Sequence, residues 1–382
     1  MKYSKISESL YIKGRIGWKG LKKKEYLQEG SYRIINGSNI VDNKIDWSNC
    51  GYISKERYDE SEEIKLKEGD ILITKDGTIG KVAMVNKLDK PSTVASGLFI
   101  LRNINLKKWD TLYLFYYLQS FKFKEFIHSR TSGSVIPHLY QRDFEELMIP
   151  ELSLKKQKQI SQKLHSIQQK IDLNNKINSN LLEFVTLIWK KYNSNTVNGV
   201  TLKKLANTIV TGKTPSTKIK ENYGNDIPFV KIPDMHNKVF IDETSQSLTL
   251  QGANSQKNKY IPANSILVSC IGTPGLVSIT DKNVQTNQQI NSLILDEKYL
   301  YCTFIELRSN KDMIGNLGSG GTTIKNLNKT DFSNIVINIP NTDKLLEKFN
   351  SVARPIFNNI HENMIQTQKL KKIKATLLSE YF

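Results

Sequence analysis

An internal repeat extends over nearly the whole chain, and it limits the folds that the chain can adopt. Residues 69–85 (GDILITKDGTIGKVAMV) align with residues 264–279 (NSILVSCIGTPGLVSI), so the Gly-Thr-x-Gly cluster that begins at Gly77 recurs at Gly272, 195 residues later. Each cluster stands between two apolar runs, which is the pattern of a strand, a tight turn and a second strand. A repeat of this length predicts two copies of one domain.

The second part of the repeat lies further along each copy. Residues 132–144 (SGSVIPHLYQRDF) align with residues 320–332 (GGTTIKNLNKTDF) at an offset of 188. A short apolar run then ends in proline in both copies, LMIP at 147–150 and VINIP at 336–340. The positions shared by the two stretches are Gly133/Gly321, Ile136/Ile324, Leu139/Leu327, Asp143/Asp331 and Phe144/Phe332.

A long helical pattern follows each proline. Its apolar residues recur at alternating intervals of four and three, which is the heptad seam of a coiled coil. The two seams correspond at an offset of 189, and both are polar at the same two central positions. Because polar seam residues fix register at a cost in stability, we expect the two helices to pair. The seam residues are Ile160, Leu164, Ile167, Ile171, Asn174, Asn178, Leu181, Val185 and Ile188 in the first helix, and Phe349, Ile356, Ile360, Asn363, Thr367, Leu370 and Leu377 in the second.

Two residues make the second helix less regular. Pro355 is expected to kink or shorten it near its start, and Lys374 is an unusual residue for a seam. The alternative to pairing is that each helix is amphipathic and covers only its own domain.

The repeat predicts an α+β chain of two globular domains in tandem, each built from mixed or antiparallel strands with helices and each followed by a long helix. We expect domains at 1–150 and 196–340, the first helix with its linker at 151–195, and the second helix at 341–382. The helices themselves are expected at about 153–193 and 342–382, and a further helix at 113–127 (YLFYYLQSFKFKEFI).

Basic residues exceed acidic ones in both halves of the chain. The sequence has 55 Lys and Arg against 37 Asp and Glu, a formal net charge of +18 and a pI near 9.5. Residues 1–195 contribute +11 and residues 196–382 contribute +7, so the excess belongs to the folded domains. This favours a polyanionic partner such as nucleic acid, although a generally Lys-rich composition would give the same excess.

The sequence shows no catalytic or metal-binding motif. TGKT at 211–214 lacks the glycine that a phosphate-binding loop needs at position 207, where Asn207 stands. The five histidines are scattered, and Cys50, Cys270 and Cys302 form no C-x-x-C pair. No apolar run approaches the roughly 18 residues of a membrane span, and no secretory signal is recognisable. We therefore expect a cytoplasmic chain with no catalytic residue, metal or membrane partner.

The order of these features resembles the specificity (S) subunits of type I DNA restriction–modification enzymes. The resemblance covers essentially the whole chain. It rests on the strand–GxxG–strand unit, the S/G-G-x-x-I-x-x-L-x-x-x-D-F stretch, the following IP, and the helices ending in WKKY and SEYF. It implies that each globular domain is a target recognition domain that reads one half of a split, asymmetric target on double-stranded DNA. It also implies that the two helices pack as an antiparallel coiled coil with pseudo-two-fold symmetry.

The resemblance further implies partners. Two methyltransferase (M) subunits, which bind S-adenosylmethionine and methylate adenine, would dock alongside, and motor-nuclease (R) subunits would complete the restriction enzyme. ATP and magnesium are expected on partner subunits, and this chain would catalyse nothing. Phe184, Trp189 and Leu378, on helix faces away from the seam, are candidate M-subunit contacts. The alternative is a stand-alone bipartite DNA-binding or scaffolding protein without a methyltransferase.

Candidate DNA contacts follow from side-chain chemistry, because Lys and Arg suit phosphates whereas Asn, Gln, Arg, Ser and Thr suit base edges. For each single residue, a solvated turn or a packing contact is the alternative, and the turn glycines are expected to be structural. The candidates are Arg15, Lys19, Lys22, Lys23, Arg33, Asn36, Ser38, Lys75, Arg130, Ser132 and Ser134 in the first domain, and Lys213, Thr214, Ser216, Lys218, Asn287, Gln288 and Gln289 in the second.

Overall fold

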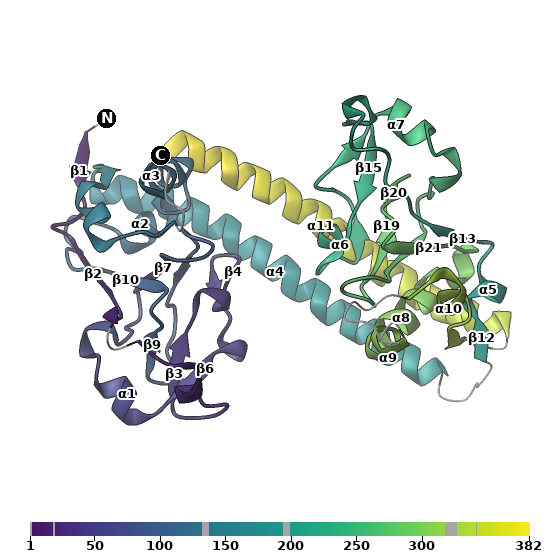
Figure 1. Cartoon of the computed structure of the whole chain (residues 1–382), viewed down its shortest axis with the longest axis horizontal. Helices are drawn as coiled ribbons and strands as arrows, with labels where there is room; N and C mark the ends of the chain where they lie inside the picture. Colours follow the sequence, from purple (N-terminus) through teal and green to yellow (C-terminus); the bar gives the residue numbers. More distant parts are fainter. Residues whose placement is uncertain (1, 18–19, 132–136, 194–198, 318–326, 341) are drawn as a thin grey trace. The chain divides into compact units, whose positions relative to one another are not determined.

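The computed structural model divides the chain into two compact units. It describes residues 2–17, 20–131, 137–193, 199–317, 327–340 and 342–382. Unit 1 comprises residues 1–171 and 369–382, and unit 2 comprises residues 172–368. Both boundaries fall inside long helices, so each unit contains one globular domain and a part of each helix (Figure 1).

The globular part of unit 1 contains two main sheets. The first has the order β2 (Leu10–Gly14), β10 (Leu98–Asn103), β7 (Ile71–Thr74), β8 (Val82–Met84), with every neighbouring pair antiparallel. The second has the order β6 (Gly51–Ile53), β3 (Tyr32–Ile35), β9 (Ser92–Val94), in which β3 and β9 are parallel. The remaining elements are the pairs β1 (Tyr3–Lys5) with β11 (Met148–Pro150) and β4 (Ile40–Val41) with β5 (Lys44–Ile45), and the helices α1 (Lys55–Asp59), α2 (Thr111–Tyr117) and α3 (Phe121–Thr131).

The globular part of unit 2 is built in a similar way. Its central sheet has the order β13 (Thr208–Thr211), β21 (Ile290–Ile294), β18 (Ile266–Ser269), β19 (Val277–Thr280), β16 (Phe240–Ile241), and only the last pair is parallel. A second sheet has the order β14 (Tyr223–Gly224), β17 (Ser247–Leu248), β15 (Ile227–Val230), β20 (Gln285–Thr286). The remaining elements are the pair β12 (Gly199–Thr201) with β22 (Val336–Asn338), and the helices α5 (Leu202–Leu205), α6 (Ile232–Met235), α7 (Leu250–Asn254), α8 (Leu300–Ser309), α9 (Lys311–Leu317) and α10 (Lys329–Ser333).

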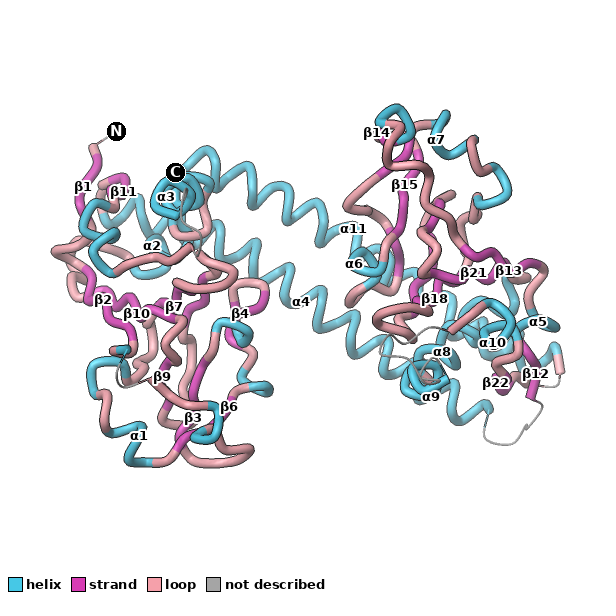
Figure 2. The backbone as a smooth tube through the Cα atoms, in the orientation of Figure 1, coloured by secondary structure: helices cyan, strands magenta, loops and turns pink. Residues whose placement is uncertain are grey.

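The same four-stranded core therefore occurs twice. The antiparallel order β2-β10-β7-β8 in unit 1 matches β13-β21-β18-β19 in unit 2, and in each case the Gly-Thr-x-Gly cluster joins the last two strands. Figure 2 shows β2, β10 and β7 side by side in unit 1, and β13, β21 and β18 side by side in unit 2. This confirms the α+β class with mixed sheets and the duplication that the sequence predicted. None of the described helices has the length and hydrophobicity needed to cross a membrane.

The two long helices are α4 (Leu154–Asn193) and α11 (Asp343–Tyr381), and they pair within each unit. In unit 1, Ile160 and Leu164 near the start of α4 share a buried cluster with Phe382, which follows α11. In unit 2, Trp189 near the end of α4 packs on Phe349 near the start of α11, with ring centroids 4.8 Å apart. The helices are therefore antiparallel, which confirms the predicted pairing and sets aside two separate amphipathic helices.

All the seam residues predicted from the heptad pattern are buried or half-buried. Lys374 also lies in the seam and is 9% exposed. Its ammonium group donates to the side-chain oxygens of Gln119 (2.9 Å) and Gln168 (2.8 Å) in unit 1. These polar partners compensate the burial of a charge that would otherwise be costly.

Pro355 was expected to kink or shorten the second helix, and the shortening does not occur. Helix α11 continues through Pro355 to Tyr381. Proline removes the hydrogen bond to the carbonyl four residues earlier, here that of Ser351. Ser351 and Pro355 are both exposed, so water can satisfy this carbonyl, while the neighbouring Ile356 and Phe357 are buried and keep the helix packed.

The single helix predicted at 113–127 is in fact two helices, α2 and α3. The break falls at 118–120, where the Ser120 hydroxyl accepts a hydrogen bond from the backbone N–H of Phe123 (3.3 Å). A serine in this position satisfies a free N–H at the start of a helix. The continuous apolar pattern of YLFYYLQSFKFKEFI concealed this start signal.

Candidate nucleic-acid interface

Three segments leave the central sheet of unit 1 at the same end. Gly14, the last residue of β2, pairs with Phe99 of β10, and Thr74, the last residue of β7, pairs with Leu98. The segment after β2, the segment before β10 and the β7–β8 turn therefore emerge together. We call this end the turn edge of unit 1; its described residues are 15–17, 20–25, 75–81 and 95–97.

Unit 2 has an equivalent turn edge. Thr211, the last residue of β13, pairs with Asn291, and Ser269, the last residue of β18, pairs with Ile290. The turn edge of unit 2 accordingly consists of residues 212–219, 270–276 and 287–289. Its segments correspond one by one to those of unit 1, because the strands that carry them have the same order in both sheets.

The same hydroxyl hydrogen bonds close the Gly-Thr-x-Gly turn in both units. In unit 1 the Thr74 hydroxyl donates to the carbonyl oxygen of Thr78 (2.6 Å) and accepts from the N–H of Lys81 (2.9 Å). In unit 2 the Ser269 hydroxyl donates to the carbonyl oxygen of Thr273 (2.5 Å) and accepts from the N–H of Leu276 (2.9 Å). A hydroxyl on the last strand residue thus fixes each turn.

The turn glycines have the structural role expected from the sequence. Gly77, Gly80, Gly272 and Gly275 have φ values of 65°, 84°, 75° and 88°, in the left-handed region that side chains other than hydrogen disfavour. Gly275 also packs closely, because a Cβ there would lie 2.8 Å from the carbonyl oxygen of Lys311.

Each turn is also bound to the other parts of the repeat. The N–H of Lys75 donates to the carbonyl oxygen of Gly97 (2.9 Å), and the N–H of Leu139 donates to the carbonyl oxygen of Lys75 (3.1 Å). The N–H of Cys270 likewise donates to Gln289 (2.8 Å), and that of Leu327 donates to Cys270 (2.9 Å). The leucine that recurs in the second aligned stretch, Leu139 in unit 1 and Leu327 in unit 2, is therefore hydrogen-bonded through its backbone to the start of the turn.

In unit 2 the structure brings together two segments that the sequence proposed separately, GKTPS and TNQQIN. The Thr214 hydroxyl donates to Oε1 of Gln288 (2.7 Å), and the N–H of Lys213 donates to the carbonyl oxygen of Thr286 (2.9 Å). The contact requires glycine at position 212, since a Cβ there would lie 2.2 Å from the carbonyl oxygen of Asn287. Of the candidate DNA contacts at this edge, Lys213, Ser216, Lys218 and Gln288 are exposed.

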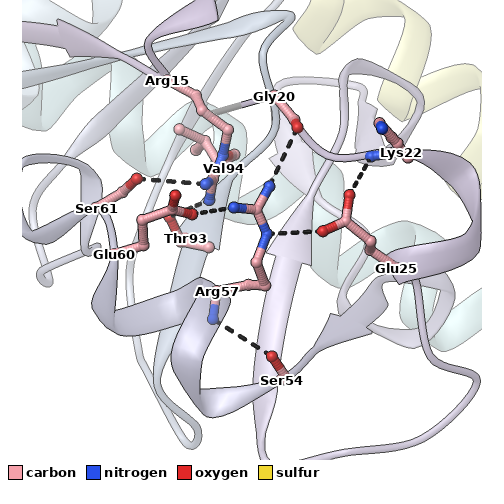
Figure 3. A network of polar contacts seen from close by, with 10 residues as sticks. All are labelled: Arg15, Gly20, Lys22, Glu25, Ser54, Arg57, Glu60, Ser61, Thr93 and Val94. Carbon is pink, nitrogen blue, oxygen red and sulfur yellow. Dashed lines mark hydrogen bonds and ion pairs between the residues drawn. The ribbon is translucent and has the colours of Figure 1, made fainter. Parts of the chain in front are cut away.

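In unit 1 a network of polar contacts holds the segment after β2 (Figure 3). Arg57 of α1 donates to the carbonyl oxygen of Gly20 (3.1 Å) and forms ion pairs with Glu25 (2.9 Å) and Glu60. Glu25 also accepts from the N–H of Lys22 (2.6 Å), whose side chain is exposed. The network fixes the backbone of a lysine-rich segment and leaves the side chains of Lys22 and Lys24 exposed to solvent.

Arg15 points into unit 1. Its guanidinium donates to the carbonyl oxygen of Val94 (3.1 Å) and to the hydroxyls of Ser61 (3.3 Å) and Thr93 (3.4 Å) (Figure 3). Burial, with the nearby charge of Arg57, lowers the pKa of Arg15 below its ordinary value. Arg15 is not part of the candidate interface, because its guanidinium N–H groups are hydrogen-bonded inside the domain.

The other first-domain candidates are dispersed. Lys75 is half-buried at the turn edge, with its ammonium 4.8 Å from the Phe99 ring centroid. Arg33 is buried on β3 and paired with Asp89, Asn36 accepts from the Tyr26 hydroxyl, and Ser38 is exposed. Arg130 forms an ion pair with Glu146. Lys19, Ser132 and Ser134 lie outside the described residues, as does the side chain of Lys23.

Sequence reasoning missed a contact between two side chains at the turn edge of unit 1. The Asp76 carboxylate meets Nδ1 of His138, whose ring packs edge-on against Tyr140 with centroids 4.6 Å apart. Asp76 and His138 lie 62 residues apart, one in each aligned stretch of the repeat. The backbone contact between those stretches, through Leu139 and Lys75, is the signal that would have placed them together.

The helix-face candidates have unequal exposure. Phe184 is 55% exposed, whereas Trp189 is 1% exposed and donates to Glu306 (2.6 Å) inside unit 2. Leu378 is half-buried against the core of unit 1. The expectation that Trp189 lies on a free helix face was therefore wrong, because its indole fills the space between α4 and α8 of unit 2.

The described residues offer no cluster of three or more His, Cys, Asp and Glu that could hold a metal ion. The three cysteines are buried, and burial raises the pKa of the Cys50 and Cys270 thiols to about 11. Thiols with such a pKa stay protonated near neutral pH and are poor nucleophiles. An open cavity of about 750 Å³ in unit 2 is lined by Asp226, Asp242, Glu243 and Asp281, whose charge disfavours a phosphate backbone.

Comparison with known protein families identifies the class of protein that has this fold, because one family matches the chain twice in tandem. The family described as the type I restriction modification DNA specificity domain matches residues 12–183 and 195–375. The chain therefore belongs to this family and carries two copies of its domain. The two matches correspond to the two copies of the repeat.

Individual relatives agree with this assignment. Over 174 residues, 44% of this chain and 38% of the relative, the chain is 47% identical to the specificity subunit of the type I restriction enzyme HindI from Haemophilus influenzae. Over 347 residues, 84% of this chain and 79% of the relative, it is 24% identical to a putative type I restriction enzyme MjaX specificity subunit from Methanocaldococcus jannaschii. The S subunit of a type I restriction-modification system from M. genitalium has the same fold, with a TM-score of 0.59 at 16% identity over 100% of this chain and 96% of that one.

Proposed function

We propose that the chain is the non-catalytic DNA-specificity subunit of a type I restriction–modification complex, and that each unit reads one half of a bipartite target on double-stranded DNA. The observation that carries the proposal is the turn edge, which occurs twice at the same end of the same sheet within two tandem specificity domains. One reading surface per domain is what a split target requires.

The two turn edges support an asymmetric target. They share a backbone scaffold but carry different side chains, the exposed amide of Gln288 beside Thr214 in unit 2 and the Asp76–His138 pair in unit 1. A symmetric homodimer reads a palindrome, because both halves present identical residues. A duplicated chain whose copies have diverged is free of this restriction.

Phosphate contacts would supply affinity without sequence preference. The exposed lysines at the turn edges, Lys22 in unit 1 and Lys213 and Lys218 in unit 2, suit this role. Exposed lysines at both turn edges agree with the basic character of the whole chain, whose formal net charge is +18.

The proposal extends to partner subunits. Two M subunits would bind S-adenosylmethionine and methylate adenine, and R subunits with ATP and magnesium would complete the restriction enzyme. An exposed apolar stripe on α4 supports docking of an M subunit along this helix, because its members recur at helical spacing on one face. The stripe consists of Leu173, Ile177, Phe184 and Leu187.

A genome-wide map of methylated adenines tests the proposal, with the chain present or deleted in cells that express a neighbouring methyltransferase. We expect a split motif, two short blocks around a fixed gap, to disappear on deletion and to return on complementation. An unchanged map in cells with active methyltransferase would contradict the proposal. Selection of split sites from random duplex DNA by the chain alone, with that map unchanged, would favour the stand-alone DNA-binding protein instead.

A further inference from the structure

We propose that Gln288 of unit 2 reads an adenine in the major groove and that Thr214 holds its amide in the reading orientation. The inference deepens the proposed function and rests on it, since it names a specificity-determining residue of one half-site. It starts from the geometry of three successive amides, Asn287, Gln288 and Gln289.

Gln288 is the exposed amide of the three. Asn287 is 8% exposed, and its Nδ2 donates to Oε1 of Gln289 (2.8 Å), while Oδ1 of Asn287 accepts from the N–H of Gln289 (3.2 Å). These two side chains are thus occupied with each other. The side chain of Gln288 projects from this closed pair into solvent at the turn edge.

The amide of Gln288 is held in one orientation. The Thr214 hydroxyl donates to Oε1 (2.7 Å), which uses one of the two lone pairs of that oxygen. This bond leaves the second lone pair of Oε1 and the N–H groups of Nε2 for a further partner. A donor and an acceptor side by side match the N7 acceptor and the N6 amino donor of adenine.

The other bases fit this pair of groups less well. Guanine presents two acceptors, N7 and O6, so Oε1 would face a second acceptor. Cytosine offers an amino donor without an adjacent acceptor, and thymine offers O4 beside a methyl group. An oriented glutamine therefore selects adenine, whereas a freely rotating one could turn its amide to suit another base.

The scaffold beneath the pair is rigid. Gly212 lets the Thr214 segment lie against residues 286–287, and the backbone of Gln289 is bonded to Cys270 at the start of the turn (2.8 Å). Lys213 next to Thr214 is exposed and can contact a phosphate. The reading group is therefore preorganised and placed beside a charge that draws DNA to it.

The test is selection of binding sites from a random duplex DNA library by the full chain, in the wild type, four test variants and two control variants. Gln288→Ala removes the amide, and Gln288→Glu replaces it with acceptors that suit the amino group of cytosine. Thr214→Val removes the hydroxyl, whereas Thr214→Ser keeps it. Gln251→Ala and Thr208→Val, exposed positions of unit 2 outside the turn edge, are matched controls.

We expect the wild type to select adenine at one fixed position of one half-site. Gln288→Ala should reduce the preference for that adenine about tenfold and leave the other positions unchanged. Gln288→Glu should shift the preference to cytosine at the same position. Thr214→Val should weaken it, whereas Thr214→Ser and both controls should retain it. A change of base preference in Thr214→Val would show that the hydroxyl positions the Gln288 amide. A merely structural role of Thr214 would change the stability of the chain and leave the base preference as it is.

Two results would overturn the inference and leave the proposed function intact: an unchanged motif in Gln288→Ala, or a uniform loss of affinity at all sequences. Failure of the wild type to select any split motif would overturn the proposed function itself, and the inference with it. Thermal unfolding identifies any variant that does not fold. If Gln288→Ala or Thr214→Val fails to fold, the base preferences of Gln288→Glu and Thr214→Ser, which preserve the side-chain shape, test the inference.

Discussion

Asn174 and Asn363 are equivalent residues of the two repeats, and they meet at the centre of the helix pair, where Nδ2 of Asn174 lies 3.4 Å from the carbonyl oxygen of Asn363. Asn178 and Thr367 are equivalent in the same way. Nδ2 of Asn174 lies 3.3 Å from the Thr367 hydroxyl, and the reciprocal contact joins Asn363 to Asn178 (2.9 Å). Reciprocal contacts of this kind are the mark of a two-fold relation between the two helix segments.

The polar seam should contribute a measurable coupling. We expect Asn178→Ala, Asn363→Ala and the double variant to show a coupling free energy of about 0.5–1.5 kcal/mol, because the single variants each remove one hydrogen bond that they share. The measurement is the free energy of unfolding in urea. Asn350 lies 13 residues before Asn363 in α11, about 20 Å along the helix. Asn178→Ala combined with Asn350→Ala should be additive, and additivity of the first pair as well would refute the coupling.

The two glycines of the second turn should differ in their tolerance of alanine. In the described part of the chain a Cβ at position 272 has no atom within 4 Å, so Gly272→Ala should cost about 1 kcal/mol for the left-handed conformation alone. Gly275→Ala has the same conformational cost and also brings its methyl group to 2.8 Å from the carbonyl oxygen of Lys311, which should add about 1–3 kcal/mol. Equal losses of unfolding free energy would show that α9 does not pack on the turn as described.

Arg57 should act on DNA binding through the loop that it holds. Arg57→Ala removes the contacts to Gly20, Glu25 and Glu60, and should lower the free energy of unfolding by about 1–3 kcal/mol. We expect weaker DNA binding with unchanged base preference, measured by fluorescence anisotropy. Arg130→Ala breaks a more exposed ion pair with Glu146 and should cost less than about 1 kcal/mol. A changed base preference in Arg57→Ala would contradict a purely positioning role.

Glu25 should make stability depend on pH in the acid range. The hydrogen bond from the N–H of Lys22, aided by the charge of Arg57, lowers the pKa of Glu25 below its ordinary value of 4.5. Its contribution to stability is therefore complete above the unfolded pKa and is lost as the pH falls through the folded pKa. We expect Glu25→Gln to lower the melting temperature near neutral pH and to approach the wild type once the pH has fallen below the folded pKa of Glu25. Glu29→Gln, an exposed neighbour, should not reproduce this pattern; a constant difference for Glu25→Gln at all pH values would refute the linkage.

Periodic and repeated features were predictable from the sequence, whereas features that depend on distant partners were not. The heptad pattern predicted both ends of each long helix to within a few residues. The aligned Gly-Thr-x-Gly stretches predicted the strands on either side of each turn. Arg15 and Arg33 were candidate DNA contacts because of their side-chain chemistry. The structure shows instead that Arg15 bonds to Val94 and Arg33 to Asp89, contacts that no local pattern encodes.

The same distinction applies within the helices. Pro355 breaks a local rule, and tertiary packing of Ile356 and Phe357 outweighs it. The Thr214 hydroxyl reaches Gln288 because Gly212 lets the segment after β13 lie close to the segment before β21. This closeness can be recognised only when β13 and β21 are known to be neighbours in the sheet. The sequence proposed the two candidate segments of unit 2 separately, and the structure brings them into contact.

The central claim, that each unit reads one half of the target, is tested most directly by exchanging residues 1–150 for the corresponding domain of another specificity subunit. The bound motif of the chimaera would be determined by selection from random duplex DNA and by mapping methylated adenines. We predict that one half-site changes to that of the donor while the other half-site stays as in the parent. A change in both halves, or in neither, would contradict the account.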